Sequence, residues 1–147
     1  MSSFELGTDG PGAIVVGVDG SPTSMRAAAY AAGLARRQRT RLIAVYARSA
    51  PTTLITLADH SGMAMNAVIE AQEELERQLR SEIGAWGAKT ELIVRQGDPL
   101  SVLSEVAKET RADAVIVGSS ASVGHRIAGS LAIRLVRCGK WPVTVVP

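Results

Sequence analysis

Short apolar runs alternate along this chain with longer segments of helical periodicity. The runs at 13–19, 41–47, 89–95, 113–117 and 142–146 are largely apolar and rich in β-branched residues. Such runs are typical of strands that are buried on both faces of a sheet. The segments between them place apolar residues three or four positions apart, which predicts helices. Strands that alternate with helices predict an α/β fold, in which an open five-stranded parallel sheet carries helices on both faces.

Residues typical of helix N-termini predict where the helices begin. Ser21 precedes Pro22, and a serine cap followed by proline at the first position favours a helix over 22–38. Further helices are predicted over 63–86, from Asp98-Pro99 onward, and up to about Gly139. Their predicted inner faces contain Met25, Ala28, Ala29, Ala32 and Ala35; Val68, Leu75, Leu79, Ile83 and Trp86; Leu100, Leu103, Val106 and Ala107; and Leu131, Leu135 and Val136.

The length of 147 residues fits a single domain. We expect residues 1–12, rich in glycine, serine and aspartate, to be a flexible tail and residues 13–147 to form the domain. No run approaches the ~20 apolar residues of a membrane helix, and no signal peptide is evident. The one cysteine, Cys138, excludes an internal disulfide and fits the cytoplasm; we expect it to be a small buried side chain.

The charge balance is nearly even, with 16 basic and 14 acidic residues and a net charge of +2. The densest basic cluster is Arg36, Arg37, Arg39 and Arg41. We interpret it as a helix C-terminus, where cations complement the helix dipole, in preference to a nucleic-acid surface. Aromatic residues make up 3%, so stacking platforms for single-stranded nucleic acid are scarce.

Two loops carry the candidate chemistry. In an open parallel sheet, ligands bind at the carboxyl ends of the strands where the strand order reverses. The first loop, 17–21, contains Asp19, whose carboxylate could accept hydrogen bonds from a ribose or an adenine amino group. The alternative is a turn residue, although Ser21 already supplies the helix cap.

The second loop, 118–124, leads on to Gly129-Ser130. Its small residues suit an anion, because backbone N–H groups and the hydroxyls of Ser119, Ser120, Ser122 and Ser130 could face phosphate oxygens. A tight turn that needs glycine only for its backbone remains equally open. The loop is neither a P-loop nor a dinucleotide fingerprint. We expect His125 and Arg126 to be exposed, and Asp59-His60 to be loop residues without metal or triad spacing.

The motifs VGVDGS (16–21), AVYA (44–47), GDP (97–99), VIVGSS (115–120) with a following GS, and WPVTVVP (141–147) carry a resemblance. The chain resembles the universal stress protein family, of the single-domain bacterial type, over essentially its whole length. That resemblance implies the sheet order 3-2-1-4-5, in a Rossmann-like fold of the adenine-nucleotide alpha-hydrolase kind.

The resemblance also implies a site for ATP or another adenine nucleotide, with or without magnesium. Asp19 and Val45 match positions that hold the adenosine, and a loop of the pattern Gly-x2-Gly-x9-Gly-Ser/Thr surrounds the ribose and phosphates. The implied site residues are Gly17, Asp19, Val45, Val117, Gly118, Ala121, Gly129, Ser130 and Leu131.

This chain departs from that loop pattern in two ways. Ala121 replaces the second glycine, and seven residues instead of nine precede Gly129. The Ala121 methyl group disfavours positive φ and close approach of a ligand to the backbone. ATP, AMP, a cyclic nucleotide and no nucleotide all remain open.

The sequence of the last predicted strand indicates that the chain pairs with a second copy. Val143–Val146 is uncharged and, in the implied order, lies at the edge of the sheet, where it invites pairing with a second copy. The family resemblance implies the same antiparallel homodimer, with Trp141 and Pro142 at its margin.

Three functions follow. The first is a non-enzymatic, nucleotide-binding dimer that regulates a stress response through an unidentified protein partner. The second is a weak ATP hydrolase, against which stands the lack of an evident general base or metal-binding carboxylate pair. The third is a nucleotide-free interaction module. A phospho-receiver domain is set aside because Asp19 has no second aspartate beside it.

Overall fold

The computed structural model describes residues 12–49, 62–87, 89–119 and 130–147. Strands and helices alternate in the predicted order and at the predicted places. In chain order they are β1 (Ala13–Gly17), α1 (Pro22–Gln38), β2 (Arg41–Arg48), α3 (Met63–Gly84), β3 (Thr90–Gln96), α4 (Pro99–Glu109), β4 (Ala112–Gly118), α5 (Ser130–Cys138) and β5 (Val143–Val146). Of the predicted tail, only Gly12 lies within the described residues.

The five strands form one parallel sheet in the order β3-β2-β1-β4-β5. This confirms the expected fold class and strand order. The order reverses between β1 and β4, so the helices that follow these two strands, α1 and α5, lie on opposite faces of the sheet. β1 is central, and all of its residues from Ala13 to Val16 are buried.

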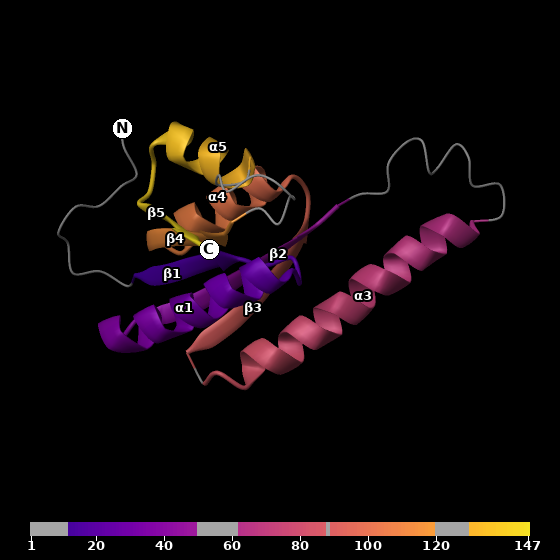
Figure 1. Cartoon of the computed structure of the whole chain (residues 1–147), viewed down its shortest axis with the longest axis horizontal. Coiled ribbons are helices and arrows are strands. Elements are labelled where there is room, and N and C mark those ends of the chain that lie inside the picture. Colours follow the sequence, from indigo (N-terminus) through magenta and orange to yellow (C-terminus); the bar gives the residue numbers. More distant parts are fainter. Residues whose placement is uncertain (1–11, 50–61, 88, 120–129) are drawn as a thin grey trace.

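Helices cover both faces of the sheet (Figure 1). α1 and α3 pack on one face over Ile14 and Val16, while α4 and α5 pack on the other over Val15 and Val115. Successive residues of a strand point to opposite faces, which is why the strands are apolar without alternation. None of the helices within the described ranges combines the length and apolarity that a bilayer crossing requires.

α1 packs on the sheet through small side chains. Five alanines are buried, namely Ala27, Ala28, Ala31, Ala32 and Ala35. The predicted inner face was wrong at Ala29, which is exposed. Residues spaced three or four apart can all lie on one helix face, so spacing alone did not decide between Ala29 and Ala31. In the structure it is Ala31 that contacts the sheet.

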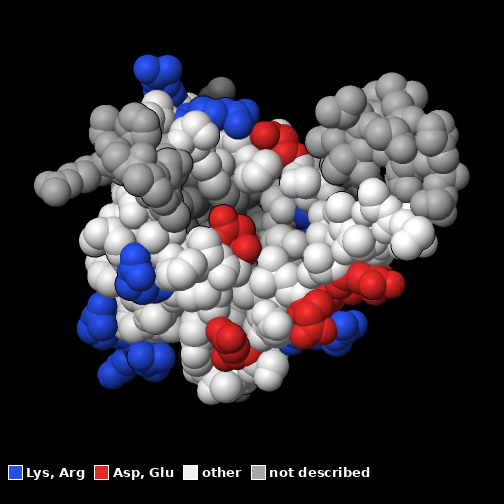
Figure 2. Space-filling view, turned by 45° about the vertical axis from the view of Figure 1, so that its right-hand side comes forward, with Lys and Arg blue, Asp and Glu red and all other residues white. Residues whose placement is uncertain are grey.

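The basic cluster occupies the end of α1, as predicted. Arg36 and Arg37 lie in the last turn, and Arg39 is the C-cap in the left-handed conformation. Figure 2 shows one face of the molecule, on which basic side chains stand in separate groups with acidic side chains among them. On the face shown, the described basic side chains do not form one continuous basic surface.

Two predictions about α5 were wrong. Val136 is 60% exposed, and Cys138 is exposed as well. α5 has only nine residues and buries Ala132 and Leu135. Val136 lies about 100° round the helix from Leu135, which turns it away from the sheet. Cys138 is the last residue of α5, and its thiol donates to the Leu135 carbonyl over 3.1 Å.

Candidate functional site

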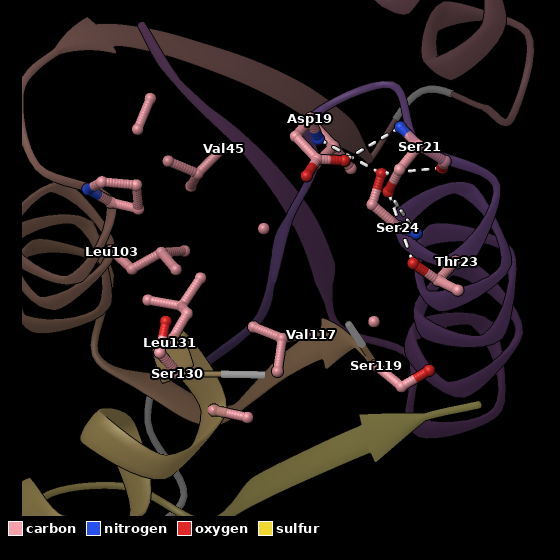
Figure 3. A pocket seen from close by; sticks show the side chains of 16 residues that line it. Asp19, Ser21, Thr23, Ser24, Val45, Leu103, Val117, Ser119, Ser130 and Leu131 are labelled. Carbon is pink, nitrogen blue, oxygen red and sulfur yellow. Dashed lines mark hydrogen bonds between the residues drawn. The ribbon is translucent and has the colours of Figure 1, made fainter. Parts of the chain in front are cut away.

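A cavity of about 300 Å³ opens at the carboxyl ends of β1, β2 and β4. α1 borders it on one side, and α4 and α5 border it on the other (Figure 3). It therefore lies at the point where the strand order reverses, which is the position that open parallel sheets use for ligands.

Seven predicted site residues line this cavity. They are Gly17, Asp19, Val45, Val117, Gly118, Ser130 and Leu131. Ser119, predicted as a hydroxyl donor, lines it too. The other two, Ala121 and Gly129, lie outside the described residues, as do Ser120, Ser122, His125, Arg126, Asp59 and His60.

The cavity also contains residues that the sequence did not indicate. The first turn of α1 contributes Thr23 and Ser24, and α4 contributes Pro99 and Leu103. Helical spacing offered one signal, because Leu103 lies four residues after Pro99 and therefore on the same face of α4. Nothing in the sequence alone showed that α4 approaches the end of β1.

Asp19 sits in a hydrogen-bonded turn between β1 and α1. Its Oδ1 accepts the backbone N–H of Ser21 over 2.9 Å, and its own N–H donates to the Ser24 hydroxyl over 3.2 Å. Asp19 is exposed. It is thus a turn residue that also lines the cavity, where its carboxylate can meet a ligand.

The Asp19 carboxyl favours its charged form. Burial raises its pKa, but hydrogen bonding to Ser21 and Ser24 outweighs burial, so the pKa lies below the ordinary value of 3.8. At neutral pH the group is an anion that accepts hydrogen bonds and donates none.

Ser21 caps α1 as predicted. The Ser21 hydroxyl accepts the N–H of Ser24 over 3.2 Å, and the Ser24 hydroxyl donates to the Ser21 carbonyl over 3.0 Å. The first of these bonds satisfies an N–H that the start of a helix leaves free. The turn is therefore preformed before any ligand arrives.

Gly118 is explained by packing within the protein. A Cβ at this position would lie 2.6 Å from the backbone carbon and oxygen of Thr23 and 2.8 Å from the nitrogen of Ser24. Since these are backbone atoms, they cannot move aside without shifting the start of α1. Gly118 therefore lets the end of β4 approach α1, whatever the cavity holds.

Gly17 is different, because a Cβ there would face side chains on the cavity side of the sheet. The nearest atoms would be the Cδ1 of Leu103 at 3.2 Å and the Cγ1 of Val117 at 3.7 Å. An alanine at this position would add a methyl group against the Leu103 wall.

α4 and α5 are linked at their cavity ends. Asp98 caps α4 by accepting the N–H of Ser101 over 3.1 Å, and its carboxylate lies 3.4 Å from the guanidinium of Arg134 on α5. The hydrogen bond from the Ser101 N–H lowers the pKa of the Asp98 carboxyl. Desolvation raises this pKa, but the nearby Arg134 guanidinium lowers it further, so the pKa lies below its ordinary value. This contact joins the start of α4, which carries Pro99, to α5, which carries Ser130.

The described lining combines apolar walls with one charge. Val45, Leu103, Val117 and Leu131 supply apolar surface, and Asp19 is its only ionisable side chain. No group of three histidine, cysteine, aspartate or glutamate residues is suitably placed for a metal ion in the described ranges. The described surface suits a flat, largely apolar group that presents a hydrogen-bond donor to Asp19.

Comparison with known proteins agrees with this geometry. The sequence model of the universal stress protein family matches residues 12–147. A universal stress protein of Methanocaldococcus jannaschii is 27% identical over 137 residues, which are 90% of this chain and 80% of the relative.

Solved structures of related proteins have the same fold. The universal stress protein from Archaeoglobus fulgidus in complex with dAMP superimposes with a TM-score of 0.62 and 26% identity, over 92% of this chain and 98% of that one. Another universal stress protein, in complex with cAMP, has a TM-score of 0.63 and 25% identity, over 92% and 97%. With a family model that matches almost the whole chain and a cavity at the expected strand ends, this chain belongs to the universal stress protein family.

Proposed function

We propose that this chain is a cytoplasmic, dimeric regulator of a stress response that binds an adenine nucleotide without transforming it. The observation that carries the proposal is the exposed acidic residue Asp19, held in a preformed turn that lines a cavity with apolar walls. Two related proteins of the same family are described in complex with dAMP and cAMP, which supports an adenine nucleotide as the ligand class.

The described residues fit the nucleoside part of such a ligand. The base would lie against the apolar side chains of Val45 and Leu103, and Asp19 would accept a hydrogen bond from a ribose hydroxyl or the amino group. A volume of about 300 Å³ lies at the lower end of the range for small-molecule sites. This size suits the adenosine part that AMP, cAMP and ATP have in common.

The phosphate end has fewer described partners. Ser119 and Ser130 line the cavity, and their hydroxyls would be the described donors to a phosphate oxygen. Asp19 is the one carboxylate of the described lining, and a magnesium ion held there would take its remaining ligands from nucleotide phosphates and water.

We also propose that β5 pairs with β5 of a second copy. The carbonyls of Pro142 and Val146 accept N–H groups from Val115 and Ser119, so these residues turn their backbone toward β4. Because backbone groups alternate along a strand, Val143 and Val145 turn theirs outward, away from β4. A free apolar edge of this kind is protected when a second strand covers it.

The nucleotide proposal is tested by calorimetric titration with AMP, cAMP and ATP, together with mass spectrometry of small molecules released on denaturation. We expect the wild-type protein to bind AMP or cAMP, and Asp19→Asn to lose at least tenfold in affinity. Asp113→Asn is the matched control, because Asp113 is exposed at the opposite end of β4. Failure of the folded wild-type dimer to bind any of the three nucleotides would favour a nucleotide-free interaction module.

A further inference from the structure

We propose that Ser24 is the positioning residue of this site, and that its buried hydroxyl holds Asp19 in the orientation that a ligand meets. The inference rests on the proposed nucleotide function, because it assigns a role within that same cavity. It goes beyond the residues that the family resemblance implies, among which Ser24 does not occur.

Ser24 is hydrogen-bonded to both Asp19 and Ser21 in the turn. Its hydroxyl accepts the Asp19 N–H over 3.2 Å and donates to the Ser21 carbonyl over 3.0 Å, while its own N–H donates to the Ser21 hydroxyl. Its hydroxyl oxygen thus joins the residue that ends β1 to the residue that caps α1. Figure 3 shows these bonds gathered on the polar side of the cavity.

Burial makes this arrangement rigid. Ser24 is 5% exposed and is the one buried polar or charged residue in the described part of the chain. A hydroxyl without partners would be costly at such a position, so both of its hydrogen bonds are strongly favoured. Water has little access with which to replace either bond.

Two close contacts fix the turn from outside. A Cβ at Gly118 would lie 2.8 Å from the Ser24 nitrogen, so the end of β4 lies directly against this residue. A Cβ at Gly20, where φ is +82°, would lie 2.5 Å from the Cδ1 of Leu75 on α3. Asp19 therefore has little freedom to take another orientation while Ser24 is in place.

Ser101 shows that this role is not common to every serine at a helix start. It occupies the same position in α4, three residues after the cap, and its hydroxyl is also hydrogen-bonded. Its partner is only its own cap, Asp98, and Ser101 is exposed. Ser24 differs because its hydroxyl bonds to the residue that faces the cavity.

The test compares Ser24→Ala with Ser101→Ala, the same substitution at the same helix position. AMP and cAMP are titrated by calorimetry, and the pKa of the Asp19 carboxyl is followed by carbon NMR in the free protein. Loss of two hydrogen bonds in Ser24→Ala should weaken nucleotide binding by roughly tenfold. We expect the Asp19 pKa to rise toward the ordinary value of 3.8. Ser101→Ala should change the nucleotide affinity by no more than about twofold and the Asp19 pKa by no more than about 0.2, because exposed hydrogen bonds have small effects.

Equal binding and an equal Asp19 pKa in Ser24→Ala and the wild type would overturn the inference while leaving the nucleotide function intact. If the wild type binds no nucleotide, the function fails, and the Asp19 pKa in the free protein still decides the role of Ser24. If Ser24→Ala does not fold, amide exchange in the wild type decides instead. The Asp19 N–H should be strongly protected, and exchange at the rate of an open loop would refute the bond to Ser24.

Discussion

The presence of glycine at position 118 can be explained in two ways, by the approach of a ligand or by packing within the protein. In the family pattern it is a glycine near the ligand, but here its missing side chain is required by the backbone of Thr23 and Ser24. The two readings differ in what an alanine would do in the absence of any ligand. If packing is the reason, the free protein itself must lose stability.

We predict that Gly118→Ala lowers the free energy of unfolding by about 1–3 kcal/mol, the usual range for an overpacked site. The control is Gly84→Ala, since a Cβ at Gly84 meets nothing within 4 Å and Gly84 ends α3. Alanine should be neutral or slightly stabilising there. Urea unfolding of both variants without nucleotide is the measurement, and equal stability of Gly118→Ala and wild type would contradict the packing explanation.

At the residue scale, the sequence indicated Asp19 because a carboxylate at the end of a central strand can accept hydrogen bonds from a nucleoside, and Asp19 does line the cavity. Its role in binding stays a prediction. The hydrogen bonds of Ser24 were not predictable, because they depend on distances that sequence spacing does not contain. Cys138 was misjudged because thiols are usually buried, whereas this one lies on the last turn of a short helix.

At the scale of elements, the contact between α4 and α5 allows the stabilisation by a helix cap to be compared with that by a surface ion pair. Asp98 takes part in both, because it caps α4 and lies 3.4 Å from Arg134. Arg134 takes part only in the pair, and both side chains are about half exposed. Exposed pairs contribute little, so the cap should dominate.

We therefore expect Asp98→Ala to lower the free energy of unfolding by about 1 kcal/mol, as removal of a helix cap does. Arg134→Ala should cost roughly 0–0.5 kcal/mol, the range for an exposed pair. Thermal and urea unfolding of both variants is the measurement, because only Asp98→Ala removes the cap while both variants remove the pair. A larger loss in Arg134→Ala than in Asp98→Ala would show that the ion pair is the main link.

Element boundaries were predictable because local signals agreed. Ser21-Pro22 and Asp98-Pro99 each mark a helix start, and both serve as cap and first residue in the structure. The inner faces were less predictable. Ala29 and Val136 were assigned inward, yet both are exposed. Helical spacing identifies a stripe, but only contact with the sheet determines which side of that stripe is covered.

At the scale of the whole molecule, strand order was predicted through family resemblance and confirmed by the sheet. Composition and periodicity led only as far as a parallel α/β sheet, since they do not specify which strands are neighbours. The cavity follows from that order, because reversal between β1 and β4 places the helices that follow them, α1 and α5, on opposite faces of the sheet. The edge position of β5 follows from it as well.

The proposed dimer makes a prediction at this scale. Val145→Pro removes an N–H from the outward edge of β5 without removing a bond to β4, and proline is tolerated on edge strands. We expect this variant to sediment as a monomer. Val145→Ala is the control, because it also shortens the side chain yet retains the N–H, and it should remain dimeric. Unchanged assembly in Val145→Pro would place the interface elsewhere.

The exposed thiol at the end of α5 gives a direct way to observe assembly. Cys138 is the single cysteine of the chain and lies five residues before β5 begins. A nitroxide attached to it would give each chain one unpaired electron, with no engineered cysteine. Any dipolar coupling between labels would then come from a second copy, so its distance distribution would report how two chains are arranged.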